Sequence, residues 1–316
     1  MKYKKYNLDS YDIYTIQTDK FKNCYIEVRF REDVRNINLS RRNLLAAAMQ
    51  YTSLKYPTKR EMIIALEELY NLSFTNDVFR VGYNHIVSFA LDFLHPKFVK
   101  EKSYLNDVIG FLFEVLLHPH IKNGSFDNRS VAILKERIHA SLDQYKERPF
   151  SFARTDSLQR IFKDSVSGKR ALGTHEELEQ VTSEDLVLEY QKMFQDAHCE
   201  ILIIGDLEMD ALVKKIQNLF YKPSIALENI PGTVVNPIHS YNEEKVASTY
   251  SQTQLLCYYQ FKELTTYEKN FVGPIFSRIL GAANTTDKLT KYLRTDNSLC
   301  YYCGFYLNYN NSFGMV

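Results

Sequence analysis

The sequence predicts an α+β fold made of two homologous units, each an antiparallel sheet with helices packed on it, and the second truncated. Three observations indicate this. Segments with strand-like alternation and segments with helical periodicity follow one another along the 316 residues. The pattern of the first hundred residues returns about 230 positions later. A proline-interrupted stretch separates the two copies.

Composition limits the classes of protein to consider. Lys and Arg number 39 and Asp and Glu 38, so no charge excess favours nucleic acid or an anionic membrane as a partner. The longest apolar run, VIGFLFEVLL at 108–117, is too short to span a bilayer and contains a glutamate. The five scattered cysteines argue against a secreted disulfide framework. We therefore expect a soluble, cytoplasmic protein.

The first copy is expected to occupy residues 1–220. Residues 21–31 alternate as a strand does, and Ser40 is the expected N-cap of an apolar helix. Thr58 and Glu61 form a capping box that predicts the start of the next helix. The remaining elements are expected as strands near 72–80 and 85–94, helices near 101–117, 127–147, 151–163 and 182–194, a strand at 199–208 and a helix to 220.

The second copy is expected at residues 245–316, after a linker at 221–244. Phe261 follows Phe30 by 231 positions, and Leu299 follows Leu72 by 227. Two offsets this similar indicate a duplication of one α+β unit. The second copy ends shortly after the strand that corresponds to 72–80, so we expect it to be partial.

Four segments carry a resemblance to a known family. They are LLAAAMQYTSLKYPTKREMIIALEELYNLSF, ALGTHEELEQVTSEDLVLEY, ILIIGDLE and LRTDNSLCYY, and they span nearly the whole chain. In this order they resemble the pitrilysin or insulinase-type zinc metallopeptidases, in particular the bacterial relatives of the mitochondrial processing peptidase. The resemblance implies two homologous domains that face each other like a clam shell.

The zinc helix of that family is degenerate in this sequence. There it carries H-x-x-E-H, in which two His bind zinc and the Glu is the general base. Aligned on the K-Y-P turn at 55–57, the ligand and base positions here hold Asn43, Ala46 and Ala47. No imidazole or carboxylate remains. We expect no bound metal, no cofactor and no peptidase activity of the chain alone.

The third zinc ligand of the family, a Glu on a later helix, has two candidate positions. One register places Glu136 there, and a register anchored on Pro149 places Ser141 there. Neither register is favoured by the sequence.

Two short motifs look metal-like without replacing the lost site. His118-Pro-His120 is expected in a solvated loop. Cys300 and Cys303 are expected on a strand, where residues three apart point to opposite faces, so the two thiols should diverge.

One feature of the family's cleft is retained, the pattern L-R-x-x-x-x-L-x-Y at 293–301. The resemblance implies that Arg294 and Tyr301 hydrogen-bond the backbone of an extended peptide beside the scissile carbonyl. The structural alternative is a solvated arginine and a core tyrosine. The family's glycine-rich loop before this pattern keeps one glycine over 280–288.

These features predict a non-catalytic, substrate-binding or regulatory subunit of a two-chain zinc peptidase. Its partner would be a zinc-bearing homologous subunit, and its ligand an extended peptide. The alternative is a non-enzymatic scaffold or protein-binding module that uses the same fold.

Overall fold

The computed structural model describes residues 3–223, 229–234, 236, 242–261, 264–282, 286–311 and 313–316. Contacts divide the chain into two compact units. Unit 1 comprises Met1–Arg80, Asn84–Leu142 and Arg170–Ile230, and unit 2 comprises Val81–Tyr83, Asp143–Lys169 and Pro231–Val316. These units are defined by contacts and not by repetition, so the repeat boundaries at 220 and 244 stay a prediction.

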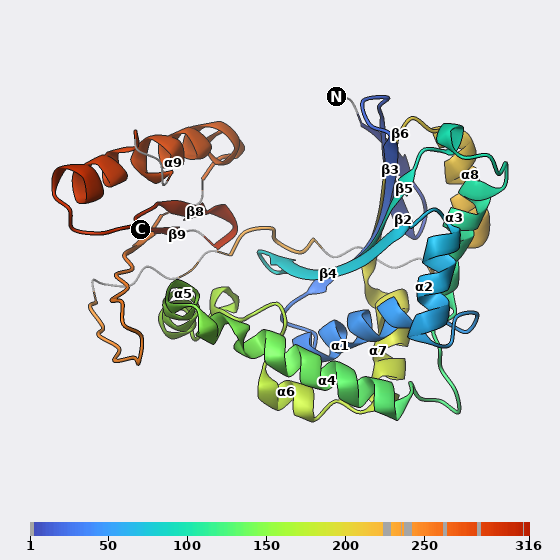
Figure 1. Cartoon of the computed structure of the whole chain (residues 1–316), viewed down its shortest axis with the longest axis horizontal. Coiled ribbons are helices and arrows are strands. Elements are labelled where there is room, and N and C mark those ends of the chain that lie inside the picture. Colours follow the sequence, from blue (N-terminus) through green and yellow to red (C-terminus); the bar gives the residue numbers. More distant parts are fainter. Residues whose placement is uncertain are drawn as a thin grey trace. The chain divides into compact units, whose positions relative to one another are not determined.

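Unit 1 contains a six-stranded sheet (Figure 1). Its strands are β1 (Lys4–Asn7), β2 (Tyr11–Gln17), β3 (Asn23–Asp33), β4 (Ser73–Val81), β5 (Asn84–Leu94) and β6 (His198–Gly205). They are ordered β1-β2-β6-β3-β5-β4. The central strand β3 is antiparallel to β5 and β6, whereas β2 and β6 run parallel, so the sheet is mixed and not purely antiparallel.

The helices of unit 1 bury an apolar face against this sheet and against one another. They are α1 (Leu39–Tyr51), α2 (Lys59–Glu68), α3 (Tyr104–Leu117), α4 (Asn128–Asp143), α6 (His175–Glu179), α7 (Ser183–Asp196) and α8 (Met209–Leu219), with a 3-10 turn, η1, at Pro96–Phe98. Helices α3 and α8 lie on one side of the sheet in Figure 1. Inward residues of β3 such as Ile26, Val28 and Phe30 are fully buried, and the predicted α+β class is confirmed.

Two of the N-caps expected from the sequence are present in the structure, and one is not. Thr58 forms its capping box with Glu61, as predicted. Thr182 caps α7 in the same way. The predicted cap Ser40 is wrong, because α1 begins two residues earlier and Asn38 accepts the amide of Arg41. Ser40 then lies within the first turn of α1, where its hydroxyl serves a tertiary contact.

Unit 2 combines a three-stranded sheet with short helices. The sheet order is β7 (Tyr258–Gln260), β9 (Phe313–Met315), β8 (Tyr306–Asn308), all antiparallel. The helical elements are η2 (Gln144–Glu147), α5 (Pro149–Ile161), η3 (Val166–Gly168), α9 (Gly273–Gly281), η6 (Tyr309–Asn311) and the π-helical turns η4 (Glu268–Val272) and η5 (Thr290–Asp296). Phe162, Phe313 and Met315 form a small core.

Parts of two predicted segments lie outside the described residues: 224–228, 235 and 237–241 of the linker, and 283–285 of the loop before η5. Among the helices that the structure describes, none has both the length and the apolar composition needed to cross a membrane.

Candidate functional site

The three degenerate zinc positions lie on α1 and offer no ligand set. Asn43 is 8% exposed and Ala46 is fully buried, while Ala47 is partly exposed. The side-chain amide of Asn43 donates to the carbonyl of Leu172 at 3.5 Å. Within the described residues, no group of three or more His, Cys, Asp or Glu side chains is placed to hold a metal ion. This part of α1 has therefore become packing surface.

A short covering segment, residues 170–174, packs against the first half of α1. The amide of Thr174 donates to the Ser40 hydroxyl at 3.0 Å, and Ala171 accepts from Nε2 of His85 at 3.0 Å. Gly173 has φ +81°, and a Cβ there would lie 2.0 Å from the Ser40 oxygen. Only glycine fits both that backbone angle and that close approach. The covering segment is thus fixed over the helix that contains the degenerate zinc positions.

Arg42, the neighbour of Asn43, is the centre of a buried polar cluster. Its Nη1 contacts the carboxylate of Glu32 and lies 3.8 Å from that of Glu189. Its Nε donates to Nδ1 of His85 at 3.2 Å, and its Nη2 donates to the carbonyl of Phe30 at 3.2 Å. The guanidinium is fully buried, so these contacts fix α1 to β3, β5 and α7.

The cluster sets the protonation state of its histidine. Burial, followed by the positive charge of Arg42, lowers the pKa of His85 to about 3. His85 is therefore neutral near pH 7, with its proton on Nε2, where it meets the carbonyl of Ala171. Burial also lowers the pKa of Arg42, to about 10, which leaves it charged at that pH.

The K-Y-P turn after α1 has a structural role. The hydroxyl of Ser53 and the amide of Lys55 both donate to the Glu114 carboxylate, at 3.0 and 2.9 Å. The amide of Tyr56 donates back to the Ser53 hydroxyl at 3.1 Å. The glutamate inside the apolar run of α3 is thus the acceptor that holds this turn, which explains why so specific a turn follows a buried helix.

The two candidates for the third-ligand position are both exposed on α4, and the structure leaves the register open. The Glu136 side chain is solvent-exposed, and the Ser141 hydroxyl donates to the carbonyl of Arg137 at 3.0 Å. The solvated loop predicted for the His-Pro-His motif is correct for His118, which is exposed. His120 differs, because it is half-buried and its buried Nε2 has no hydrogen-bond partner among the residues that the structure describes.

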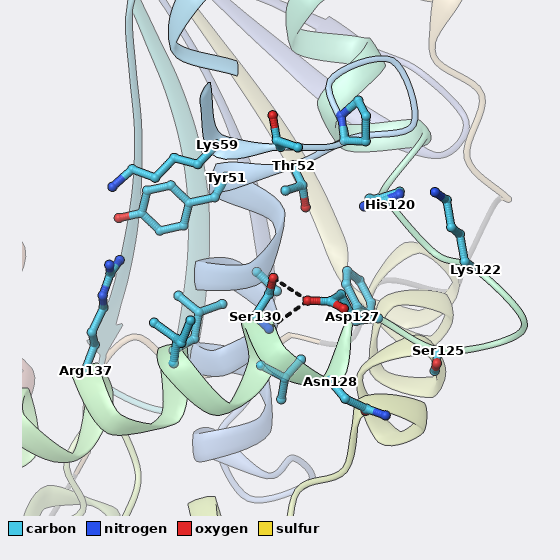
Figure 2. A pocket seen from close by; sticks show the side chains of 17 residues that line it. Tyr51, Thr52, Lys59, His120, Lys122, Ser125, Asp127, Asn128, Ser130 and Arg137 are labelled. Carbon is cyan, nitrogen blue, oxygen red and sulfur yellow. Dashed lines mark hydrogen bonds between the residues drawn. The ribbon is translucent and has the colours of Figure 1, made fainter. Parts of the chain in front are cut away.

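A hollow of about 690 Å³ opens where α1 ends, and Figure 2 shows its walls. Tyr51 lies four residues after Ala47, on the same helix face, and forms part of one wall. The floor is apolar, with Ala48, Phe126 and Leu134 among its buried side chains. The hollow therefore continues the degenerate zinc face toward the C-terminal end of α1. The sequence analysis missed it, because its lining comes from three separate stretches of the sequence, 48–52, 57–59 and 120–137.

Arg294 and Tyr301 lie together in unit 2. The guanidinium carbon is 5.0 Å from the centre of the tyrosine ring, and the tyrosine is 86% exposed. Ser298, with φ +52°, turns the chain back after η5, and Leu299 donates to the carbonyl of Leu293 at 2.7 Å. The alternative of a core tyrosine is excluded by its exposure, whereas a role in substrate binding stays a prediction.

The same turn overturns the prediction for the two cysteines. Residues 300–303 belong to no strand, since β8 begins at Tyr306. Strand alternation therefore does not apply, and the thiols interact instead of diverging. Burial and then the hydrogen bond with Cys303 raise the pKa of the Cys300 thiol.

Comparisons with known proteins agree with this geometry. A family model described as the peptidase M16 inactive domain matches residues 180–316. The probable inactive metalloprotease YmfF of Bacillus subtilis is 22% identical over 296 residues, which cover 91% of this chain and 67% of that protein. The chain is thus similar to inactive-type homologues of the M16 peptidases, in agreement with the resemblance seen in the sequence.

Further relatives and solved structures are longer than the part that this chain matches. The non-peptidase homologue YmxG of Helicobacter pylori is 28% identical over 118 residues, 37% of this chain and 26% of that protein. A conserved protein from Enterococcus faecalis has a TM-score of 0.88 at 24% identity, over 99% of this chain and 74% of that one. An M16 inactive domain from Pseudomonas fluorescens has a TM-score of 0.74 at 15% identity, over 100% and 73%. These structures share the fold.

Proposed function

We propose that this M16 homologue is the non-catalytic, substrate-binding subunit of a two-chain zinc peptidase. Its partner would be a homologous chain with an intact H-x-x-E-H helix, and its substrate an extended peptide. The observation that carries the proposal is the contrast between the two family sites. Two of the three zinc positions of α1, Asn43 and Ala46, are buried, while Arg294 and Tyr301 are adjacent and exposed.

The pair has the chemistry that such a role needs. A guanidinium packed against a ring keeps its N–H donors directed outward along a fixed plane, and the tyrosine hydroxyl adds a further donor. Donors of this kind stabilise negative charge that develops on a carbonyl oxygen in the transition state. The partner would supply the zinc-bound water, and this chain the donors.

The cytoplasm is the compartment we propose. All five cysteines are free thiols, which suits a reducing environment.

The test is reconstitution with a zinc-bearing homologue and steady-state kinetics on a peptide substrate. Arg294→Ala should lower kcat about 100-fold, the scale of losing one oxyanion donor. Lys291→Ala is the matched control, since Lys291 is an exposed cation on the same helical turn. If both variants leave turnover unchanged, the pair takes no part in catalysis by the complex.

A scaffold or protein-binding role is the second candidate. It is favoured by three large apolar side chains on α9, Ile275, Phe276 and Ile279, which are 61%, 50% and 54% exposed. Contiguous apolar exposure of this kind is typical of surfaces that contact protein. A complex that assembles with the homologue but shows no Arg294-dependent turnover would favour this candidate.

A further inference from the structure

We infer that the hollow at the end of α1 binds a carboxylate of a peptide. The inference deepens the proposed function and rests on it in one respect, the identification of the ligand as a peptide. The site is distinct from Arg294 and Tyr301 and lies wholly within unit 1.

Two cations flank one tyrosine at the mouth of the hollow. The ammonium of Lys59 lies 5.0 Å from the centre of the Tyr51 ring, and the guanidinium carbon of Arg137 lies 5.8 Å from it. Figure 2 shows the three side chains directed to the same side of the hollow. The ring holds the two cations beside the tyrosine hydroxyl, which is itself a donor.

Neither cation is neutralised by the protein. Lys59 and Arg137 make no ion pair with any residue that the structure describes, and Lys122 adds a third positive charge to the lining. The lining contains one carboxylate, that of Asp127. It is engaged as the N-cap of α4, where it accepts from the Ser130 amide at 2.8 Å and hydroxyl at 2.6 Å. The hollow therefore carries an excess of positive charge.

The helix ends add to this potential. Both α2 and α4 begin at the hollow, and the amino end of a helix carries partial positive charge. Glu61 lies nearby, but its carboxylate is held in the capping box by Thr58. Two helix N-termini and three unneutralised cations together favour an anion.

The floor favours a peptide over a small inorganic anion. Ala48, Phe126, Val131 and Leu134 are each at most 7% exposed, and they form an apolar base beneath the charged mouth. A volume of about 690 Å³ is far larger than a phosphate needs and is within the usual size of ligand pockets. A ligand that fits has apolar side chains for the floor and a carboxylate for the cations at the mouth. An acidic peptide segment and the C-terminal end of a peptide both have these groups.

Direct binding to the full chain, without its proposed partner, tests the inference. Three fluorescent peptides of one apolar framework are compared by anisotropy at low ionic strength. The first has adjacent glutamates and an amidated end, the second has glutamines and a free carboxyl end, and the third has glutamines and an amidated end. We expect the first, the second or both to bind, and the third to bind at least about tenfold more weakly. The peptide that binds shows whether the site recognises a glutamate side chain or a free C-terminal carboxylate.

Two double variants distinguish binding in the hollow from nonspecific attraction to positive charge. Lys59→Ala combined with Arg137→Ala should weaken binding about tenfold or more. Arg60→Ala combined with Arg129→Ala removes the same charge from the same two helices, at exposed positions outside the lining, and should change binding less than about twofold. Melting temperatures of both variants show that the chain still folds.

Equal binding of all three peptides, absence of binding, or equal loss in the two double variants would overturn the inference. The proposed function is tested separately by turnover of the complex. Arg294-dependent turnover without carboxylate binding would overturn the site alone. Carboxylate binding without such turnover would count against the proposed function alone.

Discussion

Two regions that the family uses for catalysis have very different surroundings in this chain. The zinc positions of α1 are enclosed: Ala46 is fully buried, and Asn43 bonds to the covering segment. The donor pair of unit 2 is open: Tyr301 is 86% exposed and the turn at Ser298 brings Arg294 beside it. One former site has become core, and the other keeps the exposure that ligand contact requires.

The difference shows how a site can lose its chemistry without loss of fold. The buried charge in α1 is on Arg42, one residue from a degenerate ligand position, and its contacts hold α1 to β3, β5 and α7. Substitutions at α1 should therefore act on stability, and substitutions at the exposed pair on function alone. Each of the following predictions tests one side of this comparison.

The largest effect is expected from Arg42→Met. The change leaves the carboxylates of Glu32 and Glu189 buried without their counter-charge, and removal of one partner from a buried ion pair typically costs about 3–5 kcal/mol. Urea unfolding measures this. Arg41→Met is the control, because the ion pair of Arg41 with Asp185 is partly exposed and should contribute less than about 1 kcal/mol. Equal losses would show that burial of Arg42 has no special role.

Glu114→Ala is expected to have the next effect. It removes the acceptor of the Ser53 hydroxyl and the Lys55 amide, and the free energy of unfolding should fall by about 1–3 kcal/mol. Glu136→Ala removes an exposed carboxylate from α4 and should change it by less than about 0.5 kcal/mol. A stable Glu114→Ala protein would mean that the turn holds its shape without this acceptor.

The buried histidine, His85, should make the free energy of unfolding depend on pH. His85 has a folded pKa of about 3 against an ordinary value of 6.5, so below pH 6.5 the unfolded chain binds more protons than the folded one. The stability that this group contributes is complete above pH 6.5 and decreases as the pH falls, by about 2 kcal/mol at pH 5. Denaturant titrations at several pH values measure the slope. His85→Gln should flatten it, whereas His118→Gln, at an exposed site, should not.

The smallest effect on stability is expected at the exposed pair. Arg294→Ala loses one cation–π contact at the surface, so its free energy of unfolding should change by less than about 1 kcal/mol. Differential scanning calorimetry of the chain alone measures this. A large loss would assign the pair a structural role and remove the contrast with α1.

Local pattern predicted much of the fold. Periodicity and capping boxes gave the order of the main elements of unit 1, because its helices are amphipathic or strongly capped. Strand β2 was missed because its pairing with β6 joins residues almost two hundred positions apart, as in the pair Ile13 and Ile201. The strand expected at Cys300 failed because one left-handed residue, Ser298, redirects the chain.

The sites also differ in how far the local sequence predicts them. The degenerate positions of α1 could be found by alignment to a motif, and the juxtaposition of Arg294 and Tyr301 required only one turn between them. The cluster around Arg42 could not be found, since its partners come from three other elements. The pair Arg41 and Arg42 in the first half of an apolar helix was the one signal available, and it did not show which of the two is buried. The hollow beside Tyr51 had no local signal at all, because tertiary packing alone assembles it.

Metal content together with activity of the purified, untagged chain tests the central claim most directly. That claim is that α1 has exchanged zinc chemistry for packing. Elemental analysis after incubation with zinc and desalting should find far less than one equivalent of zinc, and the chain alone should cleave no peptide. One tightly held zinc per chain, lost together with a peptidase activity on chelation, would contradict the account.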